Sequence, residues 1–148
     1  MITAVYGGSF NPFTIGHADI VRRALAFADE VHIVFGINIT KPETSEYTEA
    51  RIAELARHYS DEPRVKVLCY EGILAKYAAS LPGTAVLLRG IRSASDLRLE
   101  TPQADTNRLK YGVETLFLMA DPSLSYISSS LVRELRAFGE DVSEYLPQ

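Results

Sequence analysis

Apolar segments of two kinds alternate along the chain, and this alternation restricts its possible folds more than any other feature. Short runs rich in β-branched and aromatic residues predict five strands, at 2–6, 30–37, 65–70, 84–88 and 113–119. Amphipathic stretches predict helices at 18–29, 48–59, 74–81 and 95–110, with a last helix from Ser128 or Ser129 to Gly139. Strands that alternate with helices form parallel sheets. We therefore predict an α/β protein with a doubly wound, five-stranded parallel sheet.

One of these helical stretches contains a proline. Pro102 lies inside the segment 95–110, directly after Thr101. A proline within a helix removes one hydrogen bond and clashes with the preceding turn, at a cost of about 3 kcal/mol. The sequence therefore predicts a kink or a fresh helix start at this point, which leaves the placement of the nearby Glu100 open.

A glycine-rich loop joins the first predicted strand to the first helix. Residues 7–17 read GGSFNPFTIGH. A loop of this kind directs backbone N–H groups and a helix N-terminus at one point, which suits a phosphate. Ser9 and Thr14 offer hydroxyl groups, and His17 offers a ring N–H at the start of the helix. The loop is neither a Walker A motif nor a dinucleotide fingerprint, and an ordinary turn with a helix-capping histidine is the alternative.

Other chemistry-bearing residues follow other predicted strands. Lys41 follows the second strand, Arg89 and Arg92 follow the fourth, and a serine cluster at 128–130 follows the fifth. Parallel sheets of this type bind ligands beyond the carboxyl ends of their strands. The sequence thus predicts one ligand site, rich in phosphate-binding groups, at this edge of the sheet.

The motifs resemble those of a known family in both order and spacing. TIGH at 14–17 resembles the T/H-x-G-H motif of the nucleotidyltransferase superfamily, and ISSS at 127–130 resembles its second motif. Between them, RGIR at 89–92 and SDLRLE at 95–100 are similar to phosphopantetheine adenylyltransferases. The resemblance covers essentially the whole chain. It implies a Rossmann-like nucleotidyltransferase fold in a single domain, 1–148.

The resemblance implies a reaction as well as a fold. The adenylyl group of ATP would be transferred to 4′-phosphopantetheine, giving dephospho-coenzyme A and pyrophosphate, with Mg²⁺ accompanying ATP. His17, Lys41 and Arg92 would be catalytic. No residue is assigned as a metal ligand. The acceptor would contact Ser9, Lys41, Leu74 and Arg89, and ATP would contact Ser9, Phe10, His17, Gly90, Ile91, Arg92, Glu100, Leu124, Ser125, Tyr126, Ile127, Ser128, Ser129 and Ser130.

Ordinary structural roles are the alternative for several of these residues. Glu100 would be a surface carboxylate, Leu74 a core side chain, Lys41 a loop lysine and the serines helix caps. The sequence also departs from the family pattern at Leu99 and Leu124, where many members carry tyrosine and tryptophan. Two further functions stay open: nicotinate mononucleotide adenylyltransferase, which the Gly-Gly start of the loop resembles, and a non-catalytic nucleotide-binding module.

Composition limits the remaining possibilities. The net charge of −4 argues against general nucleic-acid binding. The single cysteine, Cys69, excludes an internal disulfide, and its place in an apolar strand predicts burial. No signal peptide and no long apolar span is visible, so we expect a cytoplasmic protein that does not enter membranes. The family resemblance implies a homo-oligomer, commonly a hexamer.

Overall fold

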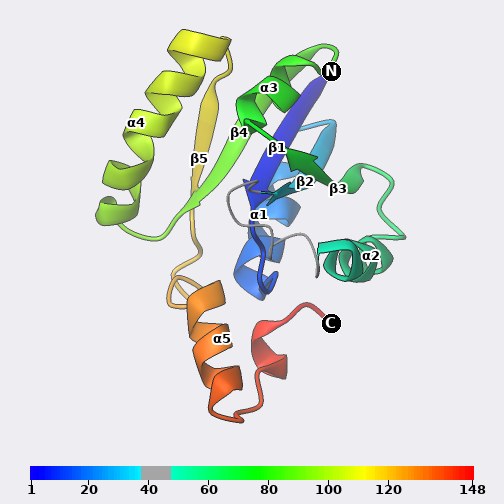
Figure 1. Ribbon diagram of the computed structural model, residues 1–148, viewed down its shortest axis with the longest axis vertical. Helices are drawn as coiled ribbons and strands as arrows, with labels where there is room; N and C mark the ends of the chain where they lie inside the picture. Colours follow the sequence, from blue (N-terminus) through cyan, green and yellow to red (C-terminus); the bar gives the residue numbers. More distant parts are fainter. Residues whose placement is uncertain (38–47) are drawn as a thin grey trace.

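The computed structural model describes residues 1–37 and 48–148 (Figure 1). Lys41 lies outside the described residues. Five parallel strands form one sheet in the order β3-β2-β1-β4-β5. The strands are β1 (Ile2–Gly8), β2 (Glu30–Ile37), β3 (Val65–Glu71), β4 (Thr84–Ile91) and β5 (Thr115–Met119). The predicted α/β class and doubly wound sheet are confirmed.

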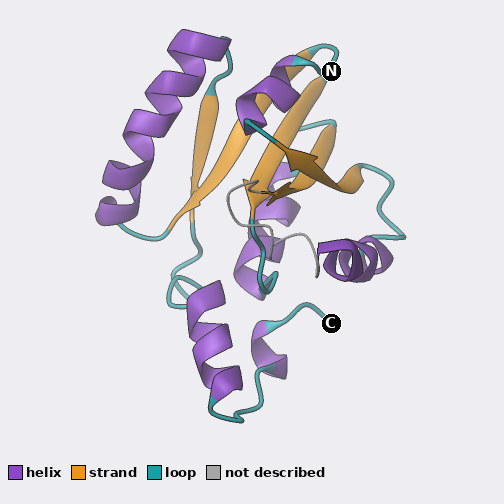
Figure 2. Cartoon of the chain, in the orientation of Figure 1, coloured by secondary structure: helices purple, strands orange, loops and turns teal. Residues whose placement is uncertain are grey.

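Helices connect the strands, and a further helix follows the last strand (Figure 2). They are α1 (Ile15–Ala24), α2 (Thr48–His58), α3 (Leu74–Ala79), α4 (Ala94–Tyr111) and α5 (Ser129–Ala137). The chain builds outward from β1 to β3 and then crosses back to β4. The strand order therefore reverses between β1 and β4, and in sheets of this kind the ligand crevice lies at that reversal.

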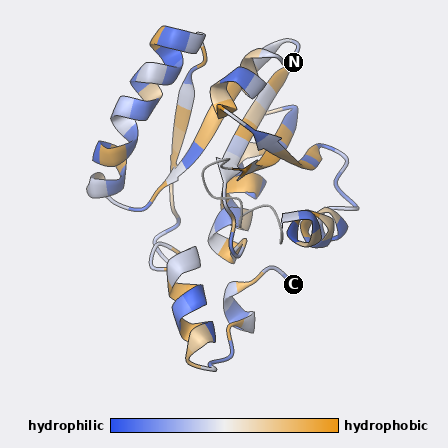
Figure 3. Cartoon of the chain, viewed as in Figure 1, coloured by the Kyte–Doolittle hydropathy of each residue, from blue (hydrophilic) through white to orange (hydrophobic). Residues whose placement is uncertain are grey.

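The sheet has an apolar core on each face, as the hydropathy of its central strands shows (Figure 3). On one face Tyr6, Ile33 and Leu88 pack with Val21 of α1 and Leu55 of α2. The other core joins the remaining strand residues to α3, and its buried members are Val5, Val34, Ala75, Ala78, Leu87 and Val113. Because both faces are covered, the central strands are nearly continuous apolar runs.

Of the element boundaries that differ from the prediction, two concern predicted site residues. α1 begins at Ile15, three residues before the predicted start at 18, because Thr14 is its N-cap. β4 continues to Ile91, so Arg89 and Gly90 lie within the strand and not in a loop after it. The extension occurs because β4 stays paired with β5 beyond the last residue that pairs with β1.

Of the two outcomes predicted at Pro102, a kink or a fresh helix start, the fresh start is wrong, since α4 runs as one helix from Ala94 to Tyr111. Pro102 removes the N–H that would bond to the carbonyl of Arg98, and both residues are exposed. Water can therefore hydrogen-bond the carbonyl that loses its partner. The predicted burial of Cys69 is also wrong: β3 is an edge strand, and the thiol is exposed.

Candidate active site

A cavity of about 360 Å³ opens at the carboxyl edge of the sheet, where β1 and β4 lie side by side. We call it the edge cavity. Its walls come from the glycine-rich loop, from α1, from the end of β4 and the following turn, from α4, and from the segment that leads into α5. Most predicted site residues line it: Ser9, Phe10, His17, Arg89, Gly90, Arg92, Glu100, Leu124, Ile127, Ser128, Ser129 and Ser130.

Helix α2 holds the glycine-rich loop from outside the edge cavity. The Arg51 guanidinium donates to the carbonyl oxygens of Ser9 and Phe10, at 2.9 and 3.5 Å. Phe10 adopts a left-handed backbone conformation with φ 44°, and its ring is buried against Tyr6 and Phe35. A non-glycine residue holds this conformation only where its surroundings stabilise it. The arginine and the aromatic packing together fix the loop.

Helix α5, near the C-terminus of the chain, also contacts the glycine-rich loop. Arg133 donates to the carbonyl oxygen of Asn11 at 2.6 Å, and the Ser129 hydroxyl donates to that of Pro12 at 2.8 Å. Together with Arg51, these groups engage four successive carbonyl oxygens of the loop. Carbonyl oxygens repel anions, whereas backbone N–H groups attract them. The loop is therefore held in a form that suits an anion in the edge cavity.

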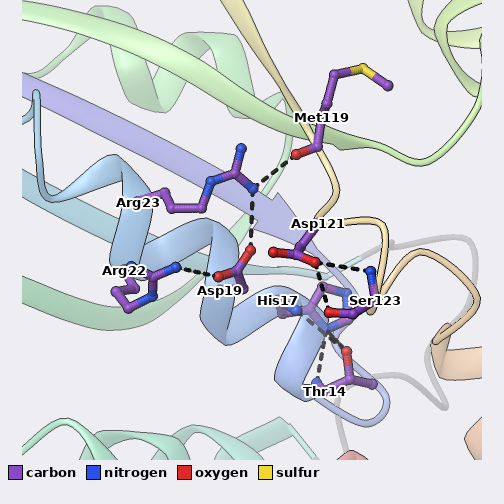
Figure 4. Close-up of polar contacts among 8 residues, drawn as sticks. All are labelled: Thr14, His17, Asp19, Arg22, Arg23, Met119, Asp121 and Ser123. Carbon is purple, nitrogen blue, oxygen red and sulfur yellow. Dashed lines mark hydrogen bonds and ion pairs between the residues drawn. The ribbon is translucent and has the colours of Figure 1, made fainter.

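His17 is the third residue of α1 and part of a capping box with Thr14. The Thr14 N–H donates to His17 Nδ1 at 2.9 Å, and the His17 N–H donates to Thr14 Oγ1 at 3.4 Å (Figure 4). Burial, and next the positive charges of Arg92 and Arg89, lower the pKa of His17 to about 4. The ring is thus neutral near pH 7, and because Nδ1 accepts a hydrogen bond, its proton is assigned to Nε2. His17 is a helix cap that keeps one N–H donor for the cavity.

Arg89 and Glu100 form a two-pronged ion pair across the cavity wall. Arg89 Nε and Nη2 donate to the two carboxylate oxygens of Glu100, at 3.1 and 2.7 Å. Arg89 Nη1 donates to the carbonyl oxygen of Gly7 at 2.9 Å. The guanidinium is therefore fixed between β1 and α4.

Arg92 lies between β4 and α4, beside a carboxylate that the sequence did not single out. Asp96 accepts from the backbone N–H of Arg92 at 3.0 Å and lies 3.6 Å from its Nε. Asp96 also lines the edge cavity, as do Tyr6, Ile20 and Ala120, which were missed as well. Two signals could have pointed to Asp96: it belongs to the SDLRLE motif at 95–100, and it is an acidic residue in the first turn of a helix.

The three serines before and within α5 have different hydrogen-bonding roles. Ser128 Oγ accepts from the Leu131 N–H at 3.1 Å and caps the helix. Ser129 is engaged with the loop carbonyl of Pro12. Ser130 lines the edge cavity, and no residue in the described part of the chain hydrogen-bonds its hydroxyl. Of the three hydroxyls, that of Ser130 is the one most available to a ligand.

Figure 4 shows how the segment after β5 is fixed. Arg23 of α1 donates to the Met119 carbonyl oxygen at 2.8 Å and also pairs with Asp19 at 3.2 Å. Beyond Met119, Asp121 accepts from both the backbone N–H and the hydroxyl of Ser123, at 2.9 and 2.7 Å. These contacts hold the start of the segment that contributes Leu124 and Ile127 to the edge cavity.

A second cavity, of about 480 Å³, lies between α3 and α4 and adjoins the first. We call it the α3–α4 cavity. Leu74, which the family resemblance assigns to the acceptor, lines it, and a Cβ added at Gly7 would collide with Leu74 Cδ2. A side chain at position 7 would therefore require the end of the Leu74 side chain to move. The two cavities share the wall residues Gly7, Gly8, Arg89, Leu99 and Glu100.

Three predicted ATP-binding residues do not line either cavity. Ile91 is buried at the end of β4, and Tyr126 is 62% exposed. Ser125 hydrogen-bonds the carbonyl oxygen of Pro122 through its hydroxyl at 3.2 Å. Their side chains are therefore not placed toward the cavities, although their backbones belong to the same segments.

Residues 1–37 and 48–148 contain neither a candidate membrane-spanning helix nor a candidate metal-binding cluster. None of the helices there is long and apolar enough to cross a membrane. Within the same ranges, no group of three or more His, Cys, Asp or Glu residues could hold a metal ion.

Comparison with known proteins defines the class. The cytidylyltransferase-like family model matches residues 5–135. A bifunctional NMN adenylyltransferase/ADP ribose pyrophosphatase from Francisella tularensis, solved with AMP and a manganese ion, shares the fold with a TM-score of 0.64. That match covers 99% of this chain and 44% of the other at 15% identity. The chain is therefore a member of the cytidylyltransferase-like family, and its fold is that of nucleotidyltransferases.

Relatives of higher sequence identity show which family within this class the chain belongs to. A protein of Porphyromonas gingivalis is 49% identical over 145 residues, which are 98% of this chain and 94% of the relative. A protein of Phocaeicola vulgatus is 43% identical over 148 residues, which are 100% and 97% of the two chains. Both carry the name phosphopantetheine adenylyltransferase. The chain belongs to the phosphopantetheine adenylyltransferase family, as the motifs predicted.

Proposed function

We propose that this protein transfers the adenylyl group of ATP to 4′-phosphopantetheine, giving dephospho-coenzyme A and pyrophosphate. The proposal is supported by two adjoining cavities that share Arg89 and Glu100 in their common wall. The edge cavity has the loop, His17 and Arg92 that suit a nucleotide triphosphate. The α3–α4 cavity is lined by the charged Arg89, by the apolar Leu74 and by the polar Asn107, a combination that suits a phosphate with a partly apolar arm.

The reaction is a direct displacement at the α-phosphorus of ATP. The acceptor phosphate attacks in line, one P–O bond forms, and the bond to pyrophosphate breaks. A phosphate monoester is already anionic near pH 7, so the attack requires no general base. Catalysis then depends on positioning the two substrates and on stabilising the charge that develops during transfer.

His17, Arg92 and Lys41 are the residues that we assign to charge stabilisation. The Nε2–H of His17 would donate to an oxygen of the α-phosphate, because Nδ1 is engaged by Thr14. Arg92 supplies a full positive charge on the same cavity wall. Lys41, outside the described residues, would contribute a flexible charge that follows the phosphates. Each donor helps most when it binds the transition state better than the ground state.

We assign ATP binding to the predicted residues of the edge cavity and to the backbone of the segments around Ile91, Ser125 and Tyr126. Mg²⁺ would enter with the nucleotide, held chiefly by phosphate oxygens and water, since no acidic cluster is available among the described residues. Bound there, it would neutralise charge on the triphosphate.

The proposal extends to the assembly and location of the protein. The family resemblance gives a homo-oligomer, commonly a hexamer, of single-domain chains. Exposed leucines on α4 and β5, Leu97, Leu109 and Leu116, support an association of copies through apolar surfaces. The cytoplasm is the proposed location, because ATP is available there. Light scattering after gel filtration would test the oligomeric state.

One assay tests the function against its rivals. Pyrophosphate release from ATP and Mg²⁺ is measured with 4′-phosphopantetheine, with nicotinate mononucleotide and with glycerol 3-phosphate as acceptors. We expect turnover to be fastest with 4′-phosphopantetheine. Faster turnover with nicotinate mononucleotide would assign the chain to that reaction instead, and ATP binding without turnover on any acceptor would make it a non-catalytic module.

A further inference from the structure

We infer that Arg23 of α1 is a positioning residue for ATP, which fixes the segment 120–127 against the base of the nucleotide. We call residues 120–127 the base segment. The inference rests on the proposed function, because it takes ATP as the nucleotide. It concerns how tightly ATP is bound and not the chemical step.

The edge cavity has walls of two kinds. His17 and Arg92 supply an N–H donor and a positive charge that suit phosphates. Another part of the wall is apolar and consists of Ile20 of α1 with Ala120, Leu124 and Ile127 of the base segment. Apolar side chains with backbone N–H and C=O groups beside them suit a flat, apolar ring with a polar edge. We therefore place the base of ATP against the base segment.

The base segment is held to the sheet by few contacts. β5 is an edge strand, and among the described residues β4 is its one neighbouring strand. The Ala120 N–H donates to the Ile91 carbonyl oxygen at 2.8 Å. Further along, backbone hydrogen bonds form local turns, from Leu124 to Asp121 and from Ile127 to Leu124. The position of the segment therefore depends on contacts with other elements.

Arg23 supplies such a contact (Figure 4). Its Nη1 donates at 2.8 Å to the carbonyl oxygen of Met119, the residue directly before the base segment. The same nitrogen donates at 3.2 Å to Oδ2 of Asp19, which lies one turn earlier on α1 and is only 11% exposed. A carboxylate four residues before an arginine holds the guanidinium in one orientation. Arg23 and Asp19 thus fix the point at which the segment leaves the sheet.

Helix α1 relates this point to the phosphate-binding groups. His17 lies in its first turn and Arg23 in its last. A Cβ added at Gly16 would lie 4.0 Å from the carbonyl oxygens of Leu124 and Ile127, so the start of α1 also approaches the base segment. One helix therefore carries both a phosphate donor and the anchor of the base segment. Loss of the anchor should weaken contacts with the base and leave those with the phosphates.

The experiment measures binding to the full chain by calorimetry in the presence of Mg²⁺. The probes are ATP, inorganic tripolyphosphate, which has the phosphates without the base, and 4′-phosphopantetheine. The variants are Arg23→Ala, Arg23→Lys, which keeps a charge and N–H donors, Asp19→Asn, and the double variant Asp19→Asn/Arg23→Ala. A thermal melt of each variant checks that it folds. If Arg23→Ala does not fold, Arg23→Lys and Asp19→Asn are compared with the wild type on the same probes.

Arg22→Ala is the matched control. Arg22 donates to Asp19 Oδ1 at 2.6 Å, but its side chain is 72% exposed and has no hydrogen bond to the base segment in the described part of the chain. Hydrogen bonds from Ser123, and after them the charges of Arg23 and Arg22, lower the pKa of Asp121. The control therefore also matches the loss of positive charge near the base segment.

For Arg23→Ala we expect the Kd for ATP to rise about tenfold, because a charge-assisted hydrogen bond that holds the base segment is lost. The Kd values for tripolyphosphate and 4′-phosphopantetheine should stay within about twofold of the wild type. Arg23→Lys and Asp19→Asn should weaken ATP binding by smaller factors. The double variant should bind ATP no more weakly than Arg23→Ala, because Asp19 acts through Arg23. Arg22→Ala should match the wild type for all three probes.

Three results would overturn the inference. Unchanged ATP affinity in folded Arg23 variants would leave Arg23 no positioning role. An equal loss for tripolyphosphate would mean that Arg23 supports the whole site, and an equal loss in Arg22→Ala would reduce the effect to the charge of α1. Failure of the proposed function is distinguishable from these results. In that case the wild type binds ATP without turnover on 4′-phosphopantetheine, while Arg23→Ala still weakens ATP binding and leaves tripolyphosphate binding unchanged.

Discussion

The imidazole of His17 is fixed by its own helix before any ligand arrives. Thr14 donates to Nδ1, and the rings of Phe10 and Phe13 pack against the imidazole with centroids 5.1 and 5.2 Å away. A ring held in one tautomer and one orientation needs no reorganisation when a phosphate binds, and such preorganised donors contribute strongly to catalysis. Capping and catalysis are therefore compatible roles for this one side chain.

The two roles of His17 can be separated by substitution. His17→Ala should lower kcat by about 10²–10³ while both KM values change little, because a donor to the transition state is lost. It should also lower stability by about 1 kcal/mol, because the capping contact is lost. Steady-state kinetics and urea unfolding would measure the two effects.

A cap-preserving variant is the control for that experiment. In His17→Gln the side-chain oxygen can accept the Thr14 N–H, as glutamine does in a capping box. Stability should return toward that of the wild type while turnover stays low. If turnover returned together with stability, His17 would act only through the loop and helix that it caps.

The depressed pKa of His17 predicts how stability depends on pH. The unfolded chain protonates His17 near pH 6.5, whereas the folded chain does so only near pH 4. Between these values the unfolded state binds more protons, so stability falls as the pH is lowered through this window. From pH 7 to pH 4.5, the wild type should lose about 2 kcal/mol more than His17→Gln. Urea unfolding of both proteins at the two pH values measures this, and equal losses would contradict the burial of a neutral imidazole.

Residue identity alone could predict that His17, Arg89 and Arg92 lie at one edge of the sheet, because each lies at or just beyond the carboxyl end of a strand. It could not predict that Glu100 engages Arg89 or that Ser129 bonds to Pro12, which is 117 positions earlier. Such contacts depend on the angle and register at which a helix packs. Those are set by the whole core and have no local pattern in the sequence.

At the scale of the element, the hydroxyls of Ser128, Ser129 and Ser130 at the start of α5 have three different roles. Ser130→Ala should weaken ATP binding by about tenfold, because its hydroxyl faces the edge cavity without a described partner. Ser128→Ala should instead lower stability by about 1 kcal/mol, since it removes the helix cap. Calorimetry with ATP and urea unfolding would compare the two. The reverse pattern would mean that Ser128 binds the nucleotide.

Helix α4 continues through a proline at which the sequence predicted a kink or a fresh helix start. The helix is anchored at its start by Ser93, whose hydroxyl accepts from the Asp96 N–H, and at its end by Gly112 in a left-handed conformation. Defined caps at both ends and an exposed, hydratable carbonyl let the helix continue through Pro102. Propensity is a local preference, and here the tertiary structure outweighs it.

The cost of Pro102 should nevertheless be measurable. Pro102→Ala restores a backbone N–H opposite the Arg98 carbonyl, which is worth up to about 3 kcal/mol. The alanine chain is also freer when unfolded, which offsets about 1 kcal/mol. We therefore expect a net gain of about 1–2 kcal/mol in urea unfolding. Asp105→Ala, which changes only helix propensity on the same exposed helix, is the control and should gain less. A loss of stability in Pro102→Ala would mean that the proline shapes α4 for packing.

At the scale of the whole molecule, the doubly wound topology explains why the site could be located from sequence. Helices on both faces bury the middle of β1 and β4, and the edge cavity lies at their carboxyl ends. The strand count and the common edge therefore followed from the alternation of patterns. The α3–α4 cavity could not be predicted in this way, because it depends on how α3 and α4 pack on the sheet. Of the residues that the family resemblance assigned to the acceptor, Leu74 and Arg89 line it.

The adjoining cavities lead to a prediction about the product. Dephospho-coenzyme A contains the adenylyl group and the pantetheine arm in one molecule, so it should occupy the edge cavity and the α3–α4 cavity together. Linking two ligands makes the second contact intramolecular, which can raise affinity by about 10²–10⁴ over either part. We expect dephospho-coenzyme A to bind at least about tenfold more tightly than ATP, and to inhibit competitively against both substrates.

AMP, which should fill the edge cavity alone, should compete with ATP and not with 4′-phosphopantetheine. Initial rates of pyrophosphate release at fixed inhibitor concentrations measure both patterns. Competition of dephospho-coenzyme A with ATP alone would place the acceptor arm outside the α3–α4 cavity, since a product that left that cavity empty could not exclude the acceptor from it.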